Sequence, residues 1–154
     1  MATRFMLFAI LGIFSFCSGC NSGKTANVSV KDILERLQSD IATIESIIIA
    51  TEETDPNNKL NKQGEYIELG WFIDSRIEKN EFNDGLGVHV GGGIEKFRNE
   101  DDAQKREKLL DSVIGTPFSP GYHERLGVFI IRISNDLTAS QQNELAEKIK
   151  KSIK

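Results

Sequence analysis

The sequence predicts an α+β domain in which a small, mainly antiparallel three-stranded sheet carries three helices on one face. Three segments have apolar residues at helical spacing, and three others alternate in polarity or are apolar throughout, as strands are. Turn-forming residues separate these segments. The expected element order is helix, strand, strand, helix, strand, helix. The favoured order of the strands in the sheet is 2-1-3.

The first helix is expected from Ser29, which can cap its N-terminus, to about Ala50. Its apolar residues recur every three or four positions at Val30, Ile33, Leu34, Leu37, Ile41, Ile44 and Ile48. Such a stripe usually packs on the protein's own sheet, and we favour that interpretation. The alternative is a face for a partner helix, which would give the chain a structural or assembly role.

Two strands are expected next, over residues 66–77 and 87–97, and they predict an antiparallel hairpin. The first alternates apolar and more polar positions, with Ile67, Leu69, Trp71, Ile73 and Ile77 on one side. The second is interrupted by three glycines at 91–93. Glycine in a strand marks an irregularity or a place where a bulky group approaches the backbone. The favoured group is Trp71 of the neighbouring strand, and the alternative is a ligand over the bare backbone.

The second half of the chain predicts helix, strand and helix. Asn99 can cap a helix that ends at Gly115, and residues 126–133 form an apolar strand. A capping box at residues 138–141 opens the last helix. The connection from the second strand through a helix to the third is expected to be a right-handed crossover, which makes those two strands parallel.

The N-terminal segment predicts export and lipidation. Residues 5–17 carry no charge and follow Arg4. This run is shorter than the ~20 residues of a membrane-spanning helix and is typical of a signal peptide, although an uncleaved anchor is the alternative. Ser18 and Gly19 before Cys20 match the lipobox of bacterial lipoproteins, except that Cys17 replaces the usual leucine. The expected organisation is a signal peptide at 1–19, a tether at 20–28 and a single domain at 29–154.

Cleavage would leave an acidic domain. Removing 19 of the 154 residues leaves 135, and the loss of Arg4 changes the formal net charge from −4 to −5. An acidic surface argues against nucleic acid as a partner and against docking on anionic lipid through a basic patch. The expected location is the outer side of the cytoplasmic membrane or the outer membrane. The membrane would be contacted through the lipid on Cys20.

Several stretches are distinctive in combination. They include ATEETDPN at 50–57, GEY at 64–66, FIDSR at 72–76, GGIEKF at 92–97 and RIS at 132–134. Together they resemble a group of small predicted lipoproteins of bacteria and phages whose function is unknown. The resemblance implies an exported protein with a compact α/β domain, and it implies no activity, cofactor or ligand. The chain departs from the group at 60–64, where relatives tend to have Leu-Gly, a basic residue and Pro-Gly.

Catalytic candidates are few. The sequence has no H-E-x-x-H and no G-x-S-x-G, and the spacing of His89 and His123 fits no metal motif. No catalytic residue, metal or cofactor is therefore predicted. A small envelope hydrolase that pairs His123 or His89 with Asp74 is the alternative function.

The favoured function is a non-enzymatic binding or interaction domain anchored by lipid in the cell envelope. Its partner would be an envelope protein or a small ligand. Asp74, Arg76 and Glu95 are the candidate binding residues, because they can lie across the predicted hairpin from one another on a polar sheet face.

Overall fold

The computed structural model describes residues 27–78, 87–116, 119 and 121–154. The predicted signal peptide at 1–19, the lipidation site Cys20 and most of the tether at 20–28 lie outside these residues. Within the described part the chain is α+β and forms three α-helices, as predicted. None of the helices described there is long and apolar enough to cross a membrane.

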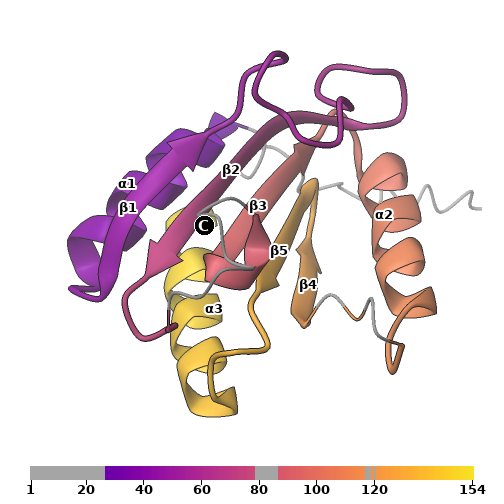
Figure 1. The fold of residues 1–154 in the computed structure, drawn as a ribbon. Helices are drawn as coiled ribbons and strands as arrows, with labels where there is room; N and C mark the ends of the chain where they lie inside the picture. The colour runs from indigo at the N-terminus through magenta and orange to yellow at the C-terminus, as the bar shows by residue number, and fades with distance from the viewer. Residues whose placement is uncertain (1–26, 79–86, 117–118, 120) are drawn as a thin grey trace, which may run out of the picture.

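Across the described residues the sheet has five strands, so the prediction of three is wrong. The elements are α1 (Val30–Asp40), β1 (Ile44–Ile49), β2 (Tyr66–Asp74), the 3-10 turn η2 (Val88–Val90), β3 (Gly91–Phe97), α2 (Glu100–Ser112), β4 (Tyr122–Leu126), β5 (Phe129–Ile133) and α3 (Ala139–Ile153). Neighbouring strands are antiparallel in the order β1-β2-β3-β5-β4 (Figure 1). The middle strand is therefore β3, and β5 is antiparallel to it, which corrects both the 2-1-3 order and the parallel third strand.

The residues of β1 fall within the range predicted for the first helix, because Ile44 and Ile48 continue the helical spacing of its apolar residues. The helix instead ends at Asp40, and Ile41 adopts extended backbone angles (φ −128°, ψ 107°). Three consecutive β-branched residues at 47–49 favour a strand, since branching at Cβ restricts the side chain in a helix and packs well on a sheet. Pairing with β2 then satisfies the backbone of this segment.

β4 and β5 form a hairpin where a single strand at 126–133 was predicted. Leu126 pairs with Phe129, which leaves Gly127 and Val128 as a two-residue turn. Gly127 has a φ of +59°, the left-handed region that such turns require and that glycine adopts most easily. The apolar run across residues 126–133 conceals this reversal of the chain.

The helices cover both faces of the sheet, so the expectation of helices on one face is also wrong. Alternate residues of β5 show this most clearly. Phe129, Ile131 and Ile133 are buried in a cluster with residues of α1 and α3, whereas Ile130 is buried with residues of α2. Figure 1 shows α1 and α3 together behind the sheet and α2 apart from them near β4. We name the two sides the α1/α3 face and the α2 face.

The stripe of α1 packs on its own sheet, as predicted. Its buried residues are Val30, Ile33, Leu34 and Leu37, each no more than 1% exposed. They belong to the same cluster as Phe72 of β2 and Leu145 of α3. The helix therefore places its stripe inside the domain.

The glycine run of β3 accommodates two aromatic residues of β2, Trp71 and Phe72. A Cβ on Gly92 would lie 2.3 Å from the ring of Phe72, and a Cβ on Gly93 would lie 2.9 Å from Cδ1 of Trp71. Each glycine is the register partner of the residue it accommodates. The prediction that Trp71 approaches the glycines is confirmed, and Phe72 does the same on the opposite face.

Candidate functional site

Asp74 and Arg76 form an ion pair at the end of β2. The guanidinium donates to the carboxylate through Nε at 2.9 Å and through Nη2 at 2.6 Å. Arg76 also donates through Nη1 to Glu144 of α3 at 2.9 Å. Hydrogen bonding to Asp74 is the main cause that raises the pKa of Arg76. These two candidate residues thus connect β2 to α3 on the α1/α3 face.

Glu95 lies on the opposite face of the sheet. Its side chain is 4% exposed, and its carboxylate accepts two bonds of 2.7 Å from Nε and Nη2 of Arg106 in α2. Arg132 of β5 adds a longer bond of 3.4 Å through Nη1. The three residues predicted to share one polar patch are therefore divided between two ion-pair clusters. Whether any of them binds a ligand stays a prediction.

Arg106 and Arg132 are the site residues that sequence reasoning missed. Arg106 lies at helical spacing between Ala103 and Leu110, the buried residues of α2, and Arg132 is the only charged residue in the strand FIIRI. A charge at a buried position usually needs a partner, and that signal could have linked both residues to Glu95. Because the partners come from separate segments, their pairing depended on a strand order that was predicted wrongly.

The two arginines are not equivalent. Burial lowers the pKa of Arg132, and the positive charge of Arg106 lowers it further, while Glu95 opposes both effects. Among the residues that the structure describes, no acceptor meets the buried Nε of Arg132. For Arg106 burial also lowers the pKa, but the bonds and charge of Glu95 more than offset it and the net shift is upward. Glu95 is thus neutralised by Arg106, and Arg132 remains an undercompensated cation.

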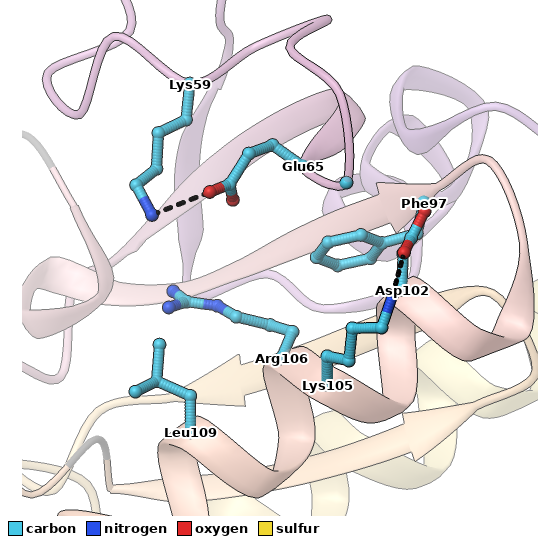
Figure 2. Close-up of a pocket in the computed structure, with 8 residues that line it drawn as sticks. Lys59, Glu65, Phe97, Asp102, Lys105, Arg106 and Leu109 are labelled. Atoms are coloured by element: carbon cyan, nitrogen blue, oxygen red, sulfur yellow. Dashed lines mark hydrogen bonds and ion pairs between the residues drawn. The ribbon is translucent and has the colours of Figure 1, made fainter.

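A small hollow of about 120 Å³ lies between α2 and the loop that precedes β2 (Figure 2). Its lining residues are Lys59, Gly64, Glu65, Phe97, Asp102, Lys105, Arg106 and Leu109. Figure 2 shows Lys59 directed toward Glu65 and Lys105 toward Asp102; these ion pairs measure 2.9 and 2.8 Å. The hollow is smaller than the roughly 300–1,000 Å³ of a drug-sized ligand site.

Asp55 organises the loop that borders this hollow. Its carboxylate accepts backbone N–H bonds from Asn57, Lys59 and Leu60 at 2.6 to 3.0 Å and a bond from the Tyr66 hydroxyl at 2.9 Å. Burial raises the pKa of Asp55, but these bonds outweigh burial and the net shift is downward. The distinctive stretch at 50–57 therefore has a structural role in this loop.

The histidines do not assemble with Asp74. His123 of β4 lies 2.9 Å through Nε2 from Asp111 at the end of α2, and His89 is exposed in η2. Strands β5 and β3 separate β4 from β2, a distance of ~14 Å at the usual spacing of strands. No hydrogen bond within the described residues joins either histidine to Asp74. No group of three or more potential metal ligands occurs in that part of the chain either.

Comparison of the chain with models of protein families, with curated proteins and with solved structures finds no match. The resemblance to small lipoproteins of bacteria and phages therefore stays a prediction from the sequence.

Proposed function

We propose that this chain is a lipid-anchored protein of the bacterial cell envelope whose single domain acts by binding a partner or ligand. The observation that carries the anchor is the N-terminal sequence, an uncharged run at 5–17 followed by Ser18, Gly19 and Cys20. Cleavage before Cys20 would leave a thiol at the new N-terminus that can accept a diacylglycerol. Two or more acyl chains hold a protein firmly at a membrane, whereas one holds it only marginally.

The entry of the chain into the domain supports a membrane-proximal position. Residues 21–29 separate Cys20 from α1, so the tether can span at most ~30 Å. Lys96 Nζ donates to the Val28 carbonyl at 2.9 Å, and the Val30 N–H donates to Glu68 at 2.7 Å. Lys96 and Glu68 also pair with each other at 2.7 Å. Because this pair belongs to the α1/α3 face, the tether would enter from that side and leave the α2 face to a partner.

The α2 face supports the binding half of the proposal. In the part of the chain that the structure describes, a single helix packs on it, and of that helix only Ala103 and Leu110 are buried. The face also carries the buried charge of Glu95 and the partly buried charges of Arg106 and Arg132. Buried charges cost stability relative to apolar packing, so a face that keeps them is a good candidate for recognition. A hydrolase has less support, because Asp74 is bound by Arg76 and His123 by Asp111.

Metabolic labelling with radioactive palmitate tests the anchor. We expect the wild type to incorporate label and to fractionate with membranes, and Cys20→Ser to do neither. Cys17→Ser is the matched control, because that cysteine lies within the segment to be removed and its loss should leave labelling unchanged. A wild-type protein that takes up no palmitate and retains Met1 by mass spectrometry would contradict the proposed anchor and location.

A further inference from the structure

Arg36 and Arg98 are exposed, and the four other arginines that the structure describes are partly buried. Three of these four use Nε to bind a carboxylate, and Arg132 does not. The edge of a guanidinium that carries Nε and Nη2 matches the two oxygens of a carboxylate or phosphate. Arg76 presents this edge to Asp74, and Arg106 presents it to Glu95. Arg125 uses Nε to reach Glu107 at 2.8 Å. At Arg132 the same Nε has no acceptor in the part of the chain that the structure describes.

The charge around Arg132 is not balanced. Two guanidinium groups share the single carboxylate of Glu95, which is already engaged by both fork nitrogens of Arg106. Arg132 reaches it only through Nη1 at 3.4 Å, a long contact for a charge-assisted hydrogen bond. The cluster therefore carries a net positive charge, while its three side chains are 4%, 18% and 22% exposed. Burial and the charge of Arg106 both lower the pKa of Arg132, as expected of an undercompensated cation.

The side chain of Arg132 is only partly covered by its neighbours. It is paired across β3–β5 with Gly93, over which Trp71 lies, and across β4–β5 with His123. Its side chain retains 22% of its exposure although Nε itself is covered. A buried donor without a partner in a native protein calls for a specific explanation, and a bound ion is one of the few that also balances charge.

We propose that Arg132, supported by Arg106 and Glu95, binds a small oxyanion of the carboxylate or phosphate type on the α2 face. The anion would accept a hydrogen bond from Nη2 of Arg132, and a small shift of the guanidinium would bring the covered Nε within its reach. Glu95 would hold the opposite side of the guanidinium through Nη1. Arg106 keeps Glu95 neutralised, so that the carboxylate does not repel the incoming anion. This names a ligand class for the binding role proposed above, and its test requires no lipid anchor.

Thermal unfolding of the purified full-length protein at constant ionic strength provides the test. Sodium phosphate and sodium acetate are titrated separately against sodium chloride, so that each source of oxyanion has its own arm. If the anion binds a specific site, an anion concentration of ten times Kd should raise the unfolding temperature of the wild type by roughly 4 °C. Arg132→Gln should abolish the rise. Arg125→Gln should retain it, because that arginine lies on the same face with its own carboxylate partner.

Nuclear magnetic resonance of the wild type makes the test independent of whether a variant folds. We expect the Nε–H signal of Arg132 to shift on titration with the stabilising anion, while that of Arg125 stays in place. The proposal is overturned if neither anion stabilises the wild type beyond chloride, or if Arg132→Gln is stabilised equally. It is also overturned if the Arg132 signal does not move. None of these outcomes bears on palmitate labelling, so failure of the anion site and failure of the anchor are distinguishable.

Discussion

The two faces of the sheet are built on different principles. The α1/α3 face is covered by two helices, and its interior is formed by aliphatic residues with Phe72 and Phe129. It buries the charge of Asp74 at the end of β2, where Arg76 pairs with it, and its ion pair between α1 and α3 is exposed. The α2 face is covered by one helix and buries Glu95 with two arginines close beside it. Apolar burial is non-directional, whereas a buried charge is stable only with well-placed partners. Between its helices the first face should therefore tolerate changes of charge, and the second should depend on single polar contacts at the middle of the sheet.

The largest expected effect distinguishes Arg106 from Arg132, the two arginines that contact Glu95. Arg106→Met leaves the carboxylate of Glu95 buried with only the long bond from Arg132, and we expect it to cost about 3–5 kcal/mol. Arg132→Met removes an undercompensated cation and should change stability by less than ~1 kcal/mol, or increase it. Urea unfolding monitored by Trp71 fluorescence measures both variants. Equal losses would mean that the two arginines share Glu95 equally, contrary to the distances.

Substitutions at Gly92 and Gly93 of β3 test how tightly each face of the sheet is packed, because these adjacent residues face opposite sides. A Cβ on Gly92 points toward the α1/α3 face, 2.3 Å from the Phe72 ring and 2.7 Å from the carbonyl oxygen of Arg132. A Cβ on Gly93 meets Trp71 Cδ1 at 2.9 Å and a carbonyl only at 3.2 Å. We expect Gly92→Ala to cost about 3 kcal/mol and Gly93→Ala about 1 kcal/mol, within the usual range for overpacking. The same urea titration tests this, and a larger loss at Gly93 would show that the α2 face is the more rigid.

The loop beside the α2 face should make stability depend on acid. The pKa of Asp55 is lower in the folded protein than its ordinary value of 3.8. Its stabilisation is therefore complete above the unfolded pKa and is lost as the pH falls through about 5 toward the folded value. Asp55→Asn should cost roughly 2 kcal/mol at pH 7. The difference in the free energy of unfolding between Asp55→Asn and the wild type should shrink as the pH falls.

Unfolding in urea at pH 7, 5, 4 and 3 measures this dependence. Glu52→Gln in the same loop is the control, because Glu52 accepts a single bond from Asn61 in an exposed position. Its effect should stay below ~0.5 kcal/mol at every pH. If Asp55→Asn lowers the free energy of unfolding by the same amount at every pH, the loop is stabilised by packing and neutral hydrogen bonds and not by the charge of the carboxylate.

Local sequence patterns predicted the elements whose signals are complete within a short segment. The Ser29 cap and the stripe of α1, the Asn99 cap of α2 and the capping box of α3 are all present in the structure. The approach of Trp71 to the glycines was also predicted. In each case the interacting residues are near in sequence, or they belong to strands joined as a hairpin.

The predictions that failed required knowledge of tertiary pairing. Ile44 and Ile48 fit a helix as well as a strand, and only pairing with β2 decides between them. Gly127 was the local sign of the β4–β5 turn, but the apolar residues on either side concealed it. The cluster of Glu95, Arg106 and Arg132 combines residues from β3, α2 and β5, so its prediction required the strand order. Asp74 and Arg76 were correctly placed near each other because only two positions separate them.

The smallest expected effect is at the rim of the α1/α3 face. Lys148 of α3 lies 3.4 Å from Asp40 of α1, and the two side chains are 39% and 54% exposed. Solvent screens such a pair, and the two long side chains lose conformational freedom when they form it. A double-mutant cycle with Lys148→Ala and Asp40→Ala should therefore give a coupling of about 0.3 kcal/mol that vanishes in 1 M sodium chloride. A coupling above ~1 kcal/mol, or one that persists in salt, would mean that charge also holds α1 and α3 together, and the contrast between the two faces would be lost.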